Sequence, residues 1–121
     1  RLGTAEIYTE VERFKEVKES IVVGQSWDND VRIILFIVMN TKFYLTEDLL
    51  KKIKFQIKKN ASPRHVPSKI IQVKDIPRTK SGKIVELAVK NILDGNNIKN
   101  KEALANPEAL KQFKNLKELS N

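Results

Sequence analysis

Cysteine is absent from this chain of 121 residues, and His65 is its only histidine. These shortages exclude disulfides, cysteine-bound metals and a histidine-rich metal centre. Long apolar runs are missing as well, so no segment of the sequence can cross a membrane as a helix. The 40% hydrophobic content nevertheless suffices for the core of one compact domain. We therefore expect a soluble chain with a real core and no metal site of its own.

A starting methionine and a leader segment are also lacking. The first residue is Arg1, and no charged stretch followed by an apolar run comes after it. We expect a piece of a longer protein whose missing part lies upstream.

Acidic residues are scarce between Asp48 and Lys90, where 12 Lys/Arg face 3 Asp/Glu and the local net charge is +9. The whole chain carries +8, so the rest nearly cancels. A basic face attracts nucleic acid, anionic lipid or small phosphorylated ligands. Phe55 is the only aromatic residue in this stretch. Composition alone does not separate these partners, but single-stranded nucleic-acid sites interleave aromatics with positive charge, so nucleic acid is the less favoured partner. Together with the motifs described below, we expect no nucleic acid and no membrane as partner.

Apolar periodicity and turn residues predict alternating helices and strands. In chain order, we expect a helix at 5–14 capped by Thr4, a hairpin of strands 20–24 and 31–39 with turn residues at 26–30, and a helix capped by Thr46. A strand at 69–73, a helix at 85–94 ended by Gly95, an irregular arm at 96–105 and a final helix that begins at Asn106-Pro107 should follow. The strand Ile33–Val38 is apolar on both sides, so helices must cover both of its faces. Trp27 is expected to pack on the hairpin, while Phe55 fits neither face of its helix.

The segment Ile76–Ile84 places Lys83 directly after a tight turn. Pro77 fixes its own φ, and Gly82 can take a positive φ that other residues adopt only at a cost. A lysine with its usual pKa of about 10.4 stays charged at neutral pH and acts on an anion as a point charge. The target would be a phosphate or a carboxylate, and the alternative is an ordinary hairpin with solvated lysines. A Walker loop is excluded, because Pro77 replaces its first glycine and Ile84 its Ser/Thr.

The spacing Pro77, four residues, Gly82-Lys83 resembles the last core motif of the adenylate-forming enzymes: acyl-CoA synthetases, nonribosomal-peptide adenylation domains and luciferases. Arg1–Ile7 resembles the segment that opens their C-terminal domain after the hinge. Both motifs occur in the family's order and at about its spacing. Within this superfamily, Ala61–Pro67, Val85–Val89 and Lys99–Leu110 are similar to the acetoacetyl-CoA synthetases, so that the resemblance spans essentially the whole chain.

The resemblance implies an α+β fold, with a small mixed sheet of about three strands plus a hairpin flanked by helices. Residues 1–95 would form the mobile C-terminal cap, and 96–121 an extension packed on the same domain. The implied enzyme is a cytoplasmic, AMP-forming acetoacetate–CoA ligase of lipid and fatty acid metabolism. Its substrates would be ATP, acetoacetate and CoA, with Mg²⁺ accompanying ATP. The cap's partner would be the N-terminal domain of the same polypeptide, which would hold the Mg²⁺ ligands.

The resemblance also implies the site residues. Lys83 would be catalytic, contacting the substrate carboxylate and the α-phosphate of ATP, and a lysine acetyltransferase and deacetylase could act on it. The residues implied for nucleotide or CoA binding are Arg1, Gly3, Lys58, Arg64 and Gly82. For Lys58 the alternative is a solvated stripe, because its helix carries five lysines. For His65, beside Arg64, the alternative is a loop residue bonded to its neighbours.

Two other functions stay open on the sequence. One is a cap for another short-chain acyl-CoA synthetase, acting on acetyl, propionyl or butyryl groups, since the acyl pocket lies in the N-terminal domain. The other is a stand-alone basic module that binds nucleic acid. As a ligase cap, the domain would supply Lys83 for adenylation and then rotate for thioester formation, and alone it would be inactive.

Overall fold

The computed structural model of the chain describes residues 4–80, 86–95, 104–114, 116 and 119. Lys83, Gly82, Arg1 and Gly3 lie outside the described residues, as does most of the expected arm. The elements in chain order are α1 (Ala5–Glu12), β1 (Val17–Trp27), β2 (Asp30–Met39), α2 (Glu47–Asn60), the 3₁₀ turn η1 (Pro63–His65), β3 (Lys69–Gln72), α3 (Glu86–Leu93) and the 3₁₀ helix η3 (Pro107–Phe113).

The sheet contains three strands in the order β1-β2-β3. β1 and β2 are antiparallel, from Val17 opposite Met39 to Trp27 opposite Asp30. β3 runs parallel to β2, with α2 in the connection between them. The fold is therefore α+β with a small mixed sheet, as predicted, and the predicted hairpin supplies two of its three strands.

The hairpin closes through a two-residue turn. Asp28 and Asn29 have φ values of 50° and 61°, a conformation that matches the twist of the strands and that Asp and Asn tolerate. Next to the turn, the Arg32 guanidinium lies 3.8 Å from the centre of the Trp27 ring. Trp27 thus packs on the hairpin, as predicted.

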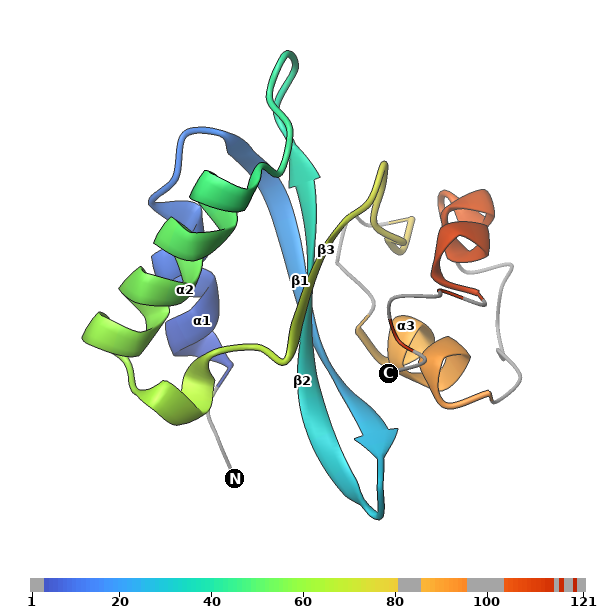
Figure 1. Cartoon of the computed structure of the whole chain (residues 1–121). Helices are drawn as coiled ribbons and strands as arrows, with labels where there is room; N and C mark the ends of the chain where they lie inside the picture. The colour runs from blue at the N-terminus through green and yellow to red at the C-terminus, as the bar shows by residue number, and fades with distance from the viewer. Residues whose placement is uncertain (1–3, 81–85, 96–103, 115, 117–118, 120–121) are drawn as a thin grey trace.

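β2 is covered on both faces (Figure 1). Leu35, Ile37 and Met39 pack against α1 and α2. The alternate residues Ile34, Phe36 and Val38 pack toward α3 and η3. This is the arrangement that the apolar run predicted, because a strand buried on both sides needs apolar residues at every position.

The layer of α1 and α2 differs in detail from the prediction. α1 ends at Glu12 rather than at 14, since the chain turns where Val17 donates to the Phe14 carbonyl. Thr4 precedes α1 with a helical backbone, and its side chain makes no capping bond. Thr46 does cap α2, accepting a hydrogen bond from the Leu49 amide. Phe55 is 61% exposed, as expected of a residue on neither face.

On the opposite face, η3 packs beside α3. Phe113 meets Phe36 edge to face, with ring centres 4.8 Å apart. Gly95, with φ of +79°, follows α3 and allows the chain to turn away. The predicted helix after Pro107 is a 3₁₀ helix rather than an α-helix. Within the described ranges, no helix is both long and apolar enough to span a membrane.

Candidate functional site

The segment 74–80 leads from β3 toward Lys83, and its beginning is buried. The last bond to the sheet is donated by the Val73 amide to the Ile37 carbonyl, at 2.9 Å. Ile76 is completely buried in the core beside α3, and Pro77 is buried next to it. The backbone polar groups of this segment therefore need partners other than strands.

Asn106 supplies several of these partners through its side-chain amide. Nδ2 donates to Asp75 Oδ2 at 2.8 Å and to the Ile76 carbonyl at 2.9 Å. Oδ1 accepts from the Arg78 amide at 2.8 Å. The backbone beside it also takes part, since the Ala105 amide donates to the Arg78 carbonyl at 2.8 Å.

Gln112, on η3, holds the start of the same segment. Its Nε2 donates to the Asp75 carbonyl at 2.6 Å, and its Oε1 accepts from the Lys74 amide at 2.7 Å. Further along, Thr79 and Leu104 form an isolated antiparallel bridge. The segment 104–112 thus runs beside residues 74–79 and pairs with them.

An ion pair joins the same segment to the sheet. The Arg78 guanidinium binds the Glu19 carboxylate of β1, and both side chains are about three-quarters buried. The segment is therefore attached to both β1 and the C-terminal part of the chain.

Beyond the residues 81–85, which lie outside the described ranges, the chain is attached again at Glu86. The Tyr8 hydroxyl donates to Glu86 Oε2 at 2.6 Å and accepts from the Val22 amide of edge strand β1 at 2.8 Å. Burial raises the pKa of Tyr8 above its ordinary value of 10.0, and the neighbouring Glu86 carboxylate adds to the rise. Tyr8 thus connects α1, β1 and the start of α3.

The end of α3 is tied to the hairpin. Lys90 Nζ donates to the Gly24 carbonyl at 3.0 Å and to Asp94 Oδ2 at 2.9 Å, while the Ser26 amide donates to Asp94 Oδ1 at 2.9 Å. Burial alone would raise the pKa of Asp94, but the bonds from Lys90 and Ser26 outweigh it and lower that pKa. α3 is therefore fixed at both ends against β1.

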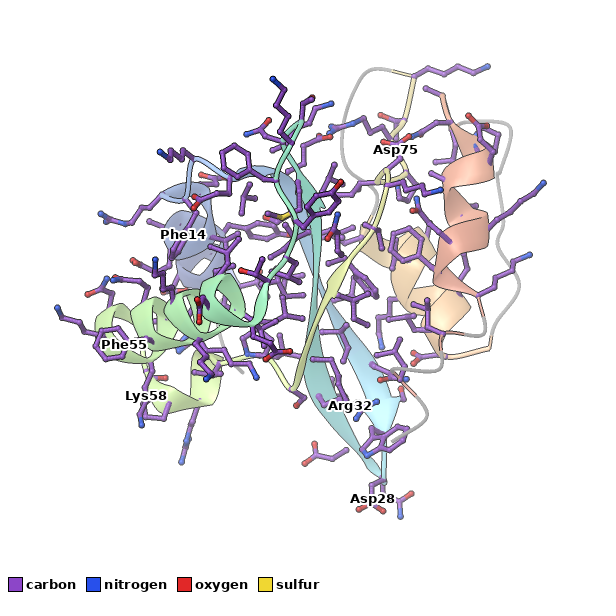
Figure 2. All side chains as sticks on the ribbon, turned by 45° about the horizontal axis from the view of Figure 1, so that its top comes forward. Phe14, Asp28, Arg32, Phe55, Lys58 and Asp75 are labelled. Carbon is purple, nitrogen blue, oxygen red and sulfur yellow. The ribbon has the colours of Figure 1, made fainter. Side chains whose placement is uncertain are left out.

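Lys58 and Arg64, two of the predicted ligand-binding residues, are exposed. Lys58 lies in the last turn of α2 and Arg64 in η1. Figure 2 shows Lys58 on the side of the sheet that α1 and α2 cover, away from Asp75. Lys58 therefore lies on the face of the sheet opposite to Asp75, which belongs to the segment 74–80.

His65 is bonded locally. Its Nδ1 lies 2.6 Å from Ser62 Oγ, and its Nε2 lies 3.9 Å from a Glu6 carboxylate oxygen. This is the alternative that the sequence left open for His65, a loop residue bonded to its neighbours.

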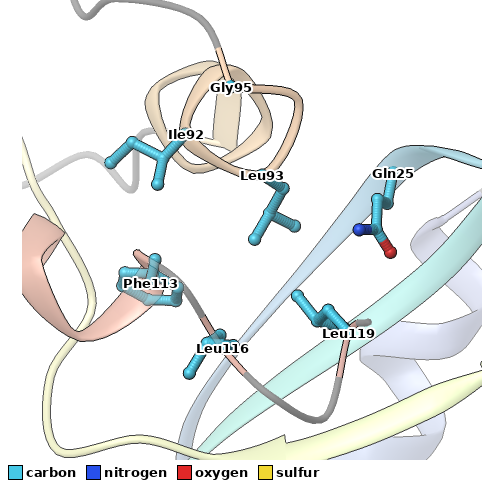
Figure 3. A pocket seen from close by; sticks show the side chains of 7 residues that line it. All are labelled: Gln25, Ile92, Leu93, Gly95, Phe113, Leu116 and Leu119. Carbon is cyan, nitrogen blue, oxygen red and sulfur yellow. The ribbon is translucent and has the colours of Figure 1, made fainter. Parts of the chain in front are cut away.

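A pocket of about 290 Å³ lies between α3, β1 and the C-terminal segment (Figure 3). The described residues that line it are Gln25, Ile92, Leu93, Gly95, Phe113, Leu116 and Leu119. None of these described residues is charged, so they supply no ion-pair partner for a phosphate.

The described residues also offer no metal centre. Among them, no group of three or more His, Cys, Asp or Glu lies close enough to hold a metal ion.

The fold and the two motifs define a class. The chain belongs to the family of AMP-binding enzyme C-terminal domains, whose profile matches residues 6–83. This confirms the superfamily resemblance that the segments at residues 1–7 and 77–83 suggested.

The relatives narrow this class. The chain is 58% identical over 121 residues to the acetoacetyl-coenzyme A synthetase of Rhizobium meliloti (strain 1021), a match that covers 100% of this chain and 19% of that protein. It is 46% identical over 122 residues to the acetoacetyl-CoA synthetase of Xenopus tropicalis, covering 100% of this chain and 18% of the relative.

Among solved structures, the acetoacetyl-CoA synthetase from Streptomyces lividans matches with a TM-score of 0.85 and 37% identity, over 93% of this chain and 17% of that one. The chain therefore spans about a fifth of the length of the relatives it matches.

The sequence did not single out Tyr8, Glu86, Asn106 or Gln112. For Asn106 the sequence offers one local signal, the pair Asn106-Pro107, which predicts the start of a helix. Its amide caps no helix, because it is bonded to the segment 75–78 instead. The Tyr8 contact with Glu86 had no local signal, since 78 residues separate the two.

Proposed function

We propose that this chain is the C-terminal cap of an ATP-dependent, AMP-forming acetoacetate–CoA ligase. The observation that carries the proposal is the similarity to acetoacetyl-CoA synthetases along the entire chain, with 58% identity to the Rhizobium meliloti protein. It includes the C-terminal segment beyond residue 83, where the general family profile stops. The fold supports the same proposal through the Streptomyces lividans enzyme.

In the first step, the acetoacetate carboxylate attacks the α-phosphorus of ATP, forming acetoacetyl-AMP while the bond to pyrophosphate breaks. Two anions approach each other in this reaction. The Lys83 ammonium lowers their repulsion where negative charge concentrates in the transition state. Removing one preorganised contact of this kind costs about 3 to 4 kcal/mol, or roughly a hundred- to a thousandfold in rate.

In the second step, the CoA sulfur attacks the acyl carbonyl, the thiol proton is released, and AMP leaves. We propose that the cap rotates between the two steps, so that one domain serves both by a shift between orientations. Lys58 and Arg64 are exposed, and the position of Lys58 on the face opposite Asp75 supports separate faces for the two steps. These cations, with Arg1 and Gly3, are assigned to nucleotide or CoA, and Gly82 to the turn before Lys83.

The same proposal assigns residues 1–95 to the rotating cap and 96–121 to its extension. The N-terminal domain of the full polypeptide supplies the acyl pocket and the ligands of the Mg²⁺ that accompanies ATP. The enzyme is cytoplasmic and belongs to lipid and fatty acid metabolism.

Assaying the full-length protein on acetoacetate, acetate and butyrate tests the function. The proposal expects the highest kcat/KM for acetoacetate. A preference for acetate or butyrate would instead assign the chain to another short-chain acyl-CoA synthetase. If all three acids are inert, and the 121-residue chain forms a salt-sensitive micromolar complex with duplex DNA or RNA, the nucleic-acid alternative replaces the ligase.

A further inference from the structure

The segment 74–78 is held by side chains that the family profile does not include. The profile matches residues 6–83, whereas Asn106 and Gln112 lie beyond it. The cap fold shared by the family therefore does not account for these two amides.

The bonds follow a regular scheme. A side-chain amide has one acceptor oxygen and one donor nitrogen, so it can pair with a peptide backbone as a neighbouring strand would. Gln112 takes the Lys74 amide and the Asp75 carbonyl, and Asn106 takes the Ile76 carbonyl and the Arg78 amide. The sheet pairing ends at Val73. Beyond it, the two side-chain amides make the backbone hydrogen bonds that a neighbouring strand would make.

The position of this segment matters because Lys83 follows Arg78 by five residues. A charged group acts in a transition state only when it is aimed accurately, and a misplacement of about 1 Å can cost on the order of a hundredfold in rate. Asp75 adds to the clamp, because one carboxylate oxygen accepts from Asn106 while the other accepts from the Ile76 amide.

We propose that Asn106 and Gln112 are positioning residues for adenylation. They fix the backbone of residues 74–78, the point from which the chain continues to Lys83. This inference rests on the proposed function, because it requires Lys83 to act in the first half-reaction. The C-terminal segment is on this account a working part of the cap.

The test uses the full-length protein and measures the half-reactions separately. Adenylation is followed by ATP–pyrophosphate exchange with acetoacetate, and thioester formation by adding acetoacetyl-AMP and CoA. Asn106→Ala and Gln112→Ala should each lower the kcat of exchange by about tenfold or more. The KM values for ATP and acetoacetate, and the thioester rate, should stay within about twofold.

Asn60→Ala is the matched control. The Asn60 amide also makes two side-chain bonds, to Glu10 at 2.8 Å and to Gln56 at 3.0 Å, but it joins α1 and α2 on the other face. Its loss should leave pyrophosphate exchange unchanged.

Substitutions that exchange Asn and Asp keep the test decisive if replacement by alanine unfolds the protein. Asn106→Asp places a second carboxylate against Asp75, which should lower exchange. Adding Asp75→Asn removes the repulsion between the two carboxylates but leaves the Ile76 carbonyl without its donor, so exchange should recover only in part. Full recovery in the double variant would overturn the inference, because the bond to the Ile76 carbonyl would then be dispensable.

Lys83→Ala separates this inference from the function beneath it. If Lys83→Ala abolishes exchange while the folded Asn106→Ala and Gln112→Ala variants keep it, only the positioning role is wrong. Equal losses in both half-reactions would reduce the amides to a purely structural role and also overturn it. If Lys83→Ala leaves exchange intact, the proposed function itself fails.

Discussion

At the scale of single residues, side-chain hydrogen bonds and the ion pair between Arg78 and Glu19 attach the chain on either side of the predicted catalytic loop. Asn106 and Gln112 hold the chain before the loop, and Tyr8 holds Glu86 after it. Each is a neutral group that contacts an element distant in sequence. The charge for the chemistry is assigned to Lys83 alone.

Replacing Lys83 by alanine should therefore separate the half-reactions. We expect ATP–pyrophosphate exchange in the full-length enzyme to fall by roughly a hundred- to a thousandfold, because the repulsion between the two reacting anions is no longer reduced. Thioester formation from supplied acetoacetyl-AMP should remain largely intact. An equal loss in both assays would contradict the assignment.

Acetylation of Lys83 should have the same effect, since it removes the ammonium charge. Enzyme prepared with acetyl-lysine at position 83 should lose pyrophosphate exchange, and deacetylase treatment should restore it. Full adenylation by a stoichiometrically acetylated sample would refute a regulatory acetyltransferase.

Tyr8→Phe should lower stability in a pH-dependent way. The substitution leaves the Val22 amide without its partner, at a cost of about 1 to 3 kcal/mol at neutral pH. The folded pKa of Tyr8 is raised, so its contribution is complete below its ordinary value of 10.0 and is lost as pH rises from there through the folded pKa. The difference in unfolding free energy between wild type and variant should therefore narrow as pH rises above the ordinary pKa of tyrosine.

Urea unfolding at about pH 8 and about pH 11 measures this gap. Tyr44→Phe serves as the control, because Tyr44 is 74% exposed. It should change little at either pH. A gap for Tyr8→Phe that is the same at both values would disprove the assignment.

At the scale of elements, β2 belongs to two cores at once. Phe36 is fully buried and contacts Phe113, while Ile37 next to it packs on the other face. When a buried side chain of β2 is truncated, the cavity that remains is enclosed by core residues on either face of the sheet.

Phe36→Ala should destabilise the chain by about 3 to 5 kcal/mol, since it leaves a cavity against Phe113. Phe55→Ala is the matched control, because that side chain is 61% exposed and should change stability by no more than about 0.5 kcal/mol. Urea unfolding of both variants decides, and similar costs for the two would contradict the core assignment.

Elements with local signals could be predicted from the sequence. Residues within each element itself determine the buried strand β2, the Thr46 cap of α2 and the turn at Asp28-Asn29. The role of Asn106 could not be predicted, because it depends on a partner segment 28 residues earlier in the chain. The predicted roles of Lys83, Arg1, Gly3 and Gly82 stay predictions, and so do those of Lys58 and Arg64.

At the scale of the whole molecule, one sheet lies between two helical layers, and each layer carries a different set of predicted contacts. α2 and η1 carry Lys58 and Arg64. The segment 74–80 lies on the side of α3 and η3. A rotation that exchanges the two sides would therefore exchange the chemistry offered to the N-terminal domain.

The 121-residue chain alone should fold but not catalyse. Its two cores should give a cooperative thermal transition by circular dichroism, because they are closed within the chain. Pyrophosphate exchange should stay at background, since the acyl pocket is assigned to the N-terminal domain. Adenylation by this chain in isolation would contradict the proposed division of labour.

The order of residues along the chain has a consequence for synthesis. Asn106 follows Asp75 by 31 residues and Gln112 follows it by 37, so the ribosome makes residues 74–78 well before their partners exist. At roughly 5 to 20 residues per second, this delay lasts about 2 to 8 seconds. During that interval the segment 74–78 lacks its side-chain partners, and its hydrogen bonds are complete only when Gln112 has emerged.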